Sequence, residues 1–199
     1  AEPAVPPEAA ADGEHLDGEE REQLRTGVVR LRVSQRYGPG IGGLAEAVRA
    51  GDADRVLELL DGGGELSLDA GTTALEAEVR EVAAGLRDAA ERGDAAGCLA
   101  LLGRHRLPCA PRHGPAGVAA WNDRIGRLAG ALPGEWPPGL PLLVTANDYE
   151  NDLWNGDTGV VVRTPDGPRA AFLRADGPDL VALSRLSSVS PAHALTVHR

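Results

Sequence analysis

The period of the apolar pattern changes near Pro137, and this change constrains the fold more than any other feature of the chain. Before it, apolar residues recur at intervals of three and four, which is typical of amphipathic helices. After it, short apolar runs alternate with turn-forming stretches such as Asn155-Gly156 and Pro165-Asp166-Gly167, which is typical of antiparallel hairpins. The order predicts an α/β part followed by a small β unit.

Periodicity and capping residues locate the expected elements. Helices are predicted at 41–51, directly after Asp52, at 72–93, directly after Asp94, and at 114–130. Strands are predicted at 28–33, briefly within 62–69, at 106–111, 142–145, 159–163, 169–174 and 180–183, and in the final HALTVHR. The closely spaced strands after Pro137 favour a small antiparallel barrel. An α/β sheet interrupted by a β insertion accounts best for this order.

Charge and composition narrow the classes of protein. The 199 residues carry a net charge of −10, but residues 1–26 hold eight acids and two Arg, a net of −6, which leaves −4 for the rest. This Pro- and Ala-rich opening predicts a linker or tail. The absence of Met indicates a mature product or an excised piece. Two cysteines and no long apolar run favour a protein of the reducing cytoplasm without a membrane span.

The residue patterns that define several classes of catalytic site are missing from this sequence. The chain contains no Lys, so it has no G-x-x-x-x-G-K-[ST] phosphate loop, and no believable Ser/His/Asp or Cys/His arrangement appears. Clustered carboxylates at Asp148, Asp152 and Asp157 do not have the spacing of a calcium loop, so we expect no metal there. These acids fit turn and capping acceptors. Tyr149 and Trp154 fit either packing at the mouth of the β unit or a platform for a DNA base.

Four segments carry a family resemblance. They are LRVSQRYGPGIGGLAEAV (31–48), CAPRHGPAGVAAWNDRI (109–125), LLVTANDYENDLWNGDTGVV (142–161) and LTVHR (195–199). In this order they resemble the motifs of RecD-like superfamily 1 DNA helicases, the family of the alpha subunit of exodeoxyribonuclease V. Pro111 and Ala146 depart from the residues common there. The resemblance implies ATP-driven 5′-to-3′ movement on single-stranded DNA during double-strand break repair and recombination.

The resemblance also implies an architecture. Residues 27–136 and 190–199 would form part of the second RecA-like motor domain of the P-loop NTPase type. Residues 137–189 would form an inserted SH3-like antiparallel β-barrel, and residues 1–26 a flexible linker. ATP and Mg²⁺ would be bound mainly by the first motor domain of a longer chain, so this fragment alone would be inactive. The expected location is a bacterial cytoplasm, and a further expected partner is single-stranded DNA. The sequence leaves two alternatives open: a parent that works in a three-subunit nuclease, with RecB and RecC as partners, or a stand-alone helicase.

Arg36 is the expected catalytic residue. In a RecA-like domain, an Arg at this junction can reach a γ-phosphate held by the partner domain and stabilise the charge of phosphoryl transfer. The resemblance puts Arg36 at this position and Tyr37 beside the nucleotide. Without the resemblance, the sequence predicts only that Arg36 is a solvated side chain in a Gly-rich turn.

The expected DNA contacts come from three segments. Thr196 and His198 share one face of the last strand, where a hydroxyl suits a backbone phosphate and the imidazole suits coupling to the nucleotide. Arg112, before a helix N-terminus, suits an anion, and Asn122 lies one turn further on. Asn147 and Tyr149 follow from the resemblance.

A rival reading belongs to another class. The acidic chain and its β unit would then form a non-catalytic interaction module that binds a protein partner. A phosphate loop upstream in the full protein would favour the motor.

Overall fold

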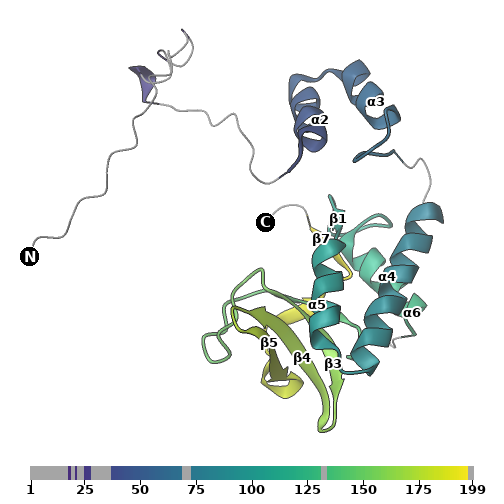
Figure 1. The fold of residues 1–199 in the computed structure, drawn as a ribbon, viewed down its shortest axis with the longest axis vertical. Coiled ribbons are helices and arrows are strands. Elements are labelled where there is room, and N and C mark those ends of the chain that lie inside the picture. Colours follow the sequence, from purple (N-terminus) through teal and green to yellow (C-terminus); the bar gives the residue numbers. More distant parts are fainter. Residues whose placement is uncertain are drawn as a thin grey trace, which may run out of the picture. The chain divides into compact units, whose positions relative to one another are not determined.

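The computed structural model describes residues 18, 21, 25–27, 37–68, 73–130 and 134–196. The chain divides into two compact units, residues 1–68 and 69–199, which are described separately (Figure 1). The strand predicted at 28–33 lies outside the described residues. No helix in the described part is both long and apolar enough to cross a membrane.

The first unit contains the helical pair α2 (Pro39–Ala50) and α3 (Ala53–Asp61). Asp52 caps α3 as predicted, since its carboxylate accepts a bond from Arg55 N–H at 3.0 Å. The brief strand expected within 62–69 is wrong for residues 62–68, which form turns and irregular backbone. Gly63 and Gly64 turn the chain with φ values of 70° and 90°, as expected for the loop, but residues 66–68 after them pair with no strand among the described residues.

The second unit begins with α4 (Thr73–Glu91) and α5 (Ala95–Arg104), both confirmed. Asp94 accepts a bond from Gly97 N–H at 2.8 Å and caps α5 as predicted. The two helices pack together against the β unit (Figure 1).

The β unit is a five-stranded antiparallel sheet with the order β5-β4-β3-β2-β6. Its strands are β2 (Pro141–Val144), β3 (Thr158–Thr164), β4 (Gly167–Arg174), β5 (Gly177–Ala182) and β6 (Val189–Pro191). The predicted Pro165-Asp166-Gly167 turn joins β3 to β4. The antiparallel strands are confirmed.

The prediction that this sheet closes into a barrel is wrong for the described residues. The edge strands β5 and β6 do not pair with each other. The chain leaves β5 in a 3₁₀ turn, η1 (Leu183–Arg185), and β6 is only three residues long with a proline at its end. Proline lacks an amide hydrogen, and a short edge strand offers few backbone hydrogen-bonding groups. Strand β6 therefore provides too few backbone partners for the sheet to close.

Both faces of the sheet are covered by apolar side chains. One face packs on α4 and α5 through Val160, Val162 and Ala171. The other gathers Val161 and Phe172 with Leu140, Leu142, Val144, Leu153, Ala170 and Val181. Gly159 is required beneath this second cluster, because a Cβ there would lie 2.6 Å from the Phe172 ring.

A separate two-stranded parallel sheet lies beside the helices. It pairs β1 (Leu107–Cys109) with β7 (Ala194–Thr196), and Leu107 lies opposite Ala194. Helix α6 (Val118–Leu128) covers it through Trp121 and Ile125, which are buried with Cys109 and Ala194. Parallel strands need a crossover. Here the crossover contains α6 and the whole five-stranded sheet, so the sheet is inserted between α6 and β7.

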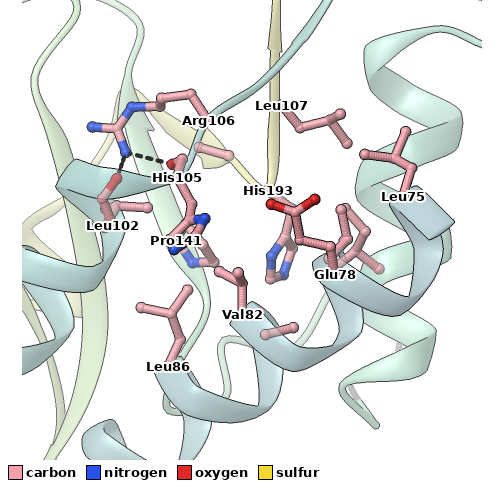
Figure 2. A pocket seen from close by; sticks show the side chains of 14 residues that line it. Leu75, Glu78, Val82, Leu86, Leu102, His105, Arg106, Leu107, Pro141 and His193 are labelled. Carbon is pink, nitrogen blue, oxygen red and sulfur yellow. Dashed lines mark hydrogen bonds between the residues drawn. The ribbon is translucent and has the colours of Figure 1, made fainter. Parts of the chain in front are cut away.

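A cavity of about 90 Å³ lies between α4 and the segments that lead into β1 and β7 (Figure 2). Its walls are mostly apolar, and Glu78, His105, Arg106 and His193 supply the polar groups. Burial lowers the pKa of His193 to about 4, so its imidazole is neutral at physiological pH.

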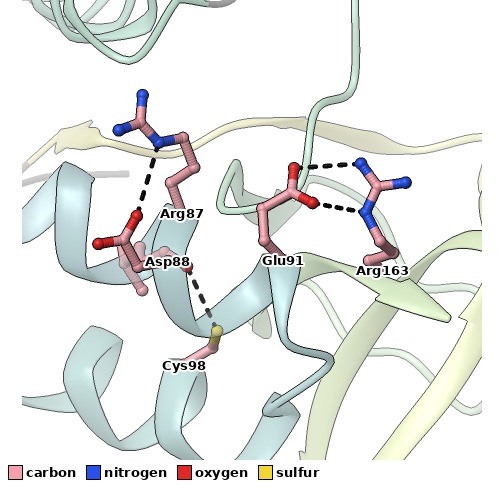
Figure 3. Close-up of polar contacts among 6 residues, drawn as sticks. Arg87, Asp88, Glu91, Cys98 and Arg163 are labelled. Atoms are coloured by element: carbon pink, nitrogen blue, oxygen red, sulfur yellow. Dashed lines mark hydrogen bonds and ion pairs between the residues drawn. The ribbon is translucent and has the colours of Figure 1, made fainter.

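Polar contacts tie α4 to the sheet. Glu91, the last residue of α4, pairs with Arg163 of β3 through two bonds, one of them 3.2 Å from Nη2 to Oε1 (Figure 3). The side-chain hydrogen bond from Arg163 lowers the pKa of Glu91. The nearby Cys98 thiol lies 3.5 Å from the Leu86 carbonyl oxygen, and burial raises its pKa to about 11, which makes it an unreactive core residue.

Candidate nucleic-acid interface

The loop between β2 and β3 presents two aromatic rings to solvent. Tyr149 is 76% exposed and Trp154 is 48% exposed. Their centroids are 5.6 Å apart and their planes meet at 85°, an edge-to-face pair. Asn147 Nδ2 lies 3.4 Å from the Tyr149 hydroxyl oxygen. Of the chain's six aromatic residues, these two form an accessible surface of the kind on which nucleobases stack.

Hydrogen bonds hold this loop in one conformation. Asp148 and Leu153 exchange backbone bonds of 2.8 and 2.9 Å, and the Leu153 side chain is buried. The Asp148 carboxylate accepts two bonds from Asn151, which lower its pKa. Asp157 accepts a bond from Trp154 N–H at 2.9 Å. Asp148 and Asp157 are therefore the turn acceptors that the sequence predicts, and they fix the aromatic pair in place.

The charge of the loop decides what kind of contact it can make. Asp148, Glu150, Asp152 and Asp157 lie close to Tyr149 and Trp154 in the sequence of this loop, and Arg174 lies 3.7 Å from Asp157. Carboxylates repel phosphates, so this surface favours contact with bases rather than with the sugar–phosphate backbone.

Phosphate contacts would have to come from another segment. Arg112 is exposed in the loop between β1 and α6. The amides at the start of α6 are already engaged, since Val118 N–H donates to the Pro111 carbonyl at 3.1 Å and Ala119 N–H to the Arg112 carbonyl at 3.2 Å. An anion at this helix start would therefore bind the Arg112 side chain and not those two amides.

Asn122 does not point away from the protein. Its side chain makes two hydrogen bonds to the backbone of Ala194, at 3.1 Å from Nδ2 to the carbonyl oxygen and 3.0 Å from Ala194 N–H to Oδ1. Thr196 ends β7 two residues later and is partly buried.

Comparisons with known proteins agree with the sequence motifs. The chain is 47% identical over 182 residues to the RecBCD enzyme subunit RecD of Mycolicibacterium smegmatis, and 45% identical over 181 residues to that of Mycobacterium tuberculosis. These alignments cover 87% and 86% of the chain. This chain belongs to the RecD family. It spans about a third of the length of these curated relatives, 32% in each case. No protein-family model matches it.

The RecD-family chain brings only some of the predicted site residues together. Asn147 and Tyr149 are neighbours in one loop, while Arg112 and Asn122 flank the start of α6 and Thr196 ends β7. Tyr37 is 46% exposed just before α2. Arg36 and His198 lie outside the described residues. The roles of all these residues stay predictions.

Sequence reasoning did not find two features of this RecD-family chain. One is the bonding of Asn122 to the strand that carries Thr196, which no local pattern signals because the partners are 72 positions apart. The other is the desolvation of His193, which depends on residues from α4 and α5 that line the same cavity.

Proposed function

We propose that this chain is part of an ATP-dependent 5′-to-3′ DNA helicase and translocase of the RecD type, which acts in double-strand break repair and recombination. The observation that carries this proposal is the 45–47% identity to RecD subunits over most of the chain. The relatives are subunits of the RecBCD enzyme, so RecB and RecC are the expected partners. Such a protein would act in the bacterial cytoplasm.

The proposed architecture is a partial RecA-like motor domain with an inserted antiparallel β-sheet. The parallel β1–β7 pair covered by α6 supports the first part, since parallel strands with helical crossovers build RecA-like sheets. The five-stranded sheet between α6 and β7 supports the second.

Within this motor, the chain would supply one wall of the nucleotide site and part of the DNA track. Arg36 would stabilise the charge that develops on the transferred phosphoryl group, with Tyr37 beside the nucleotide. ATP and Mg²⁺ would be bound mainly by the first motor domain of the longer protein. Arg112 and Thr196 would contact the DNA backbone, His198 would couple the bound DNA to the nucleotide, and Tyr149 with Asn147 would contact a base.

The aromatic pair gives the proposal a direct test in the 199-residue chain. Tyr149→Ala is expected to weaken binding of a short oligo-dT strand by about 5- to 150-fold, because base–aromatic stacking contributes roughly 1–3 kcal/mol. Fluorescence anisotropy at low ionic strength suits the measurement, since a chain of net charge −10 should bind weakly and lose affinity steeply with salt.

Two further variants control this experiment. Tyr149→Phe keeps the ring and should bind like wild type, whereas Leu128→Ala removes an exposed apolar side chain at the C-terminal end of α6 and should change nothing. Equal affinities for Tyr149→Ala and Leu128→Ala, with unchanged melting temperatures, would show that DNA does not stack on this loop.

One observation favours the rival reading of a protein-binding module. Leu173 and Leu180 are 67% and 40% exposed on β4 and the edge strand β5. Exposed apolar groups beside an open strand edge suit a protein partner. A Leu173→Ala, Leu180→Ala double variant that loses a RecB or RecC interaction while its ATP turnover persists would assign this surface to assembly within the same motor.

A further inference from the structure

The Asn122 carboxamide makes the two hydrogen bonds to Ala194 that the backbone of a neighbouring strand would make. It accepts the Ala194 N–H and donates to the Ala194 carbonyl, with bonds of 3.0 and 3.1 Å. Such a reciprocal pair is the pattern by which residues of adjacent strands bind each other. Ala194 is only 1% exposed, so neither of its backbone groups has bulk water as an alternative partner.

The opposite side of β7 is held by β1. Backbone groups of successive strand residues point in opposite directions, so the groups of Leu195 face away from Asn122 and toward β1. Leu195 lies opposite Pro108, which has no amide hydrogen to donate. In a parallel pair, the partners of Leu195 are the residues on either side of Pro108, so the proline costs no bond. Strand β7 is thus fixed from both sides.

The helix that carries Asn122 is itself firmly placed. Ile125, 1% exposed, and Trp121, 7% exposed, anchor α6 in the cluster that includes Ala194. The loop before α6 carries Arg112, and the strand after Ala194 carries Thr196. Asn122 therefore connects the two segments to which the proposed function assigns phosphate contacts.

We infer that Asn122 is a positioning residue, and not a DNA ligand: its carboxamide holds β7 against α6 so that Arg112 and Thr196 keep a fixed relative position. This inference rests on the proposed function for its purpose, but the bond pair itself can be tested without DNA. Neither the RecD resemblance nor the helix periodicity predicts this role.

The first test measures amide hydrogen exchange in the 199-residue chain. Asn122→Ala should speed exchange in a peptide that covers Ala194 to Thr196 by about ten-fold or more, because two buried backbone groups lose their partners. Asn122→Asp keeps the size and the acceptor but places a carboxylate against a carbonyl oxygen, and it should do the same. Asp123→Ala is the matched control on the exposed face of α6, where Asp123 pairs with Arg127. Unchanged exchange in both Asn122 variants would overturn the inference.

The second test separates positioning from direct contact. If Asn122 acts through β7, Asn122→Ala and Thr196→Ala should not be additive in their effect on oligo-dT affinity, and the double variant should resemble Thr196→Ala alone. Additive losses would mean that Asn122 contacts DNA itself, and would overturn the positioning role. A third outcome is that Thr196→Ala binds oligo-dT like wild type while the Asn122 variants still exchange faster. This outcome would refute the DNA contact of β7, which belongs to the proposed function, and with it the purpose given to the bond pair.

Discussion

Arg36→Ala, introduced into a full-length protein that carries this segment, should lower DNA-stimulated ATP turnover on the order of a thousand-fold, the scale of an arginine finger. The loss would arise because charge on the transferred phosphoryl group would no longer be neutralised in the transition state. Arg36→Lys should restore little, since an ammonium lacks the planar fork that grips phosphate oxygens. Steady-state turnover at saturating ATP and DNA measures both effects.

The Arg36→Ala substitution should not impair folding. Arg36 stands three positions before Pro39, the first residue of α2, and a positive side chain near a helix N-terminus is slightly unfavourable for the helix dipole. Removing it should therefore leave the melting temperature unchanged or slightly raised. A drop of several degrees, with turnover per folded molecule intact, would assign Arg36 a structural role.

His193 should make the stability of the chain depend on pH between about 6.5 and 4. Its imidazole is desolvated beside α4, and burial lowers its pKa from 6.5 to about 4. The unfolded chain takes up a proton near pH 6.5, whereas the folded chain takes it up only near pH 4. The free energy of unfolding should therefore fall as the pH falls through this window, by up to about 3 kcal/mol. The partial exposure of the side chain makes this an upper limit.

A difference measurement isolates this residue from the many carboxylates. His193→Gln keeps a neutral polar side chain at every pH, so urea unfolding of both proteins at several pH values gives the contribution of His193 alone. The difference in the free energy of unfolding between wild type and His193→Gln should change steadily from pH 6.5 to pH 4 and then stay constant. Parallel curves would mean that His193 is solvated in the folded chain. The neighbouring Glu78, His105 and Arg106 line the same cavity and are unchanged in both proteins.

Local patterns were sufficient for most helices and hairpins of this chain. Asp52 and Asp94 mark helix starts because a carboxylate there accepts a hydrogen bond from the first turn, an interaction between residues three positions apart. The Pro165-Asp166-Gly167 turn is equally local. In the loop between β2 and β3, Asp148 and Asp157 are turn acceptors because Asp, Asn and Gly favour tight turns wherever they cluster.

Contacts between distant segments could not be predicted in the same way. The pairing of Cys109 with Thr196 joins strands separated by 87 positions, and the burial of His193 depends on α4. Strand β6 is three residues long and ends in Pro191, so it shows no alternation to detect. The amide of Asn122 fits solvent, DNA or a backbone partner equally well until the position of β7 is known.

The proposed RecD-type motor is tested most directly by strand separation with the full-length protein. The substrates are one duplex with a 5′ single-stranded tail and the same duplex with a 3′ tail, each incubated with and without ATP and Mg²⁺. We predict ATP-dependent unwinding of the 5′-tailed duplex, no unwinding of the 3′-tailed duplex, and loss of the activity in Arg36→Ala. Strand separation that ignores ATP, that prefers the 3′ tail, or that is absent from a folded full-length protein would contradict this function.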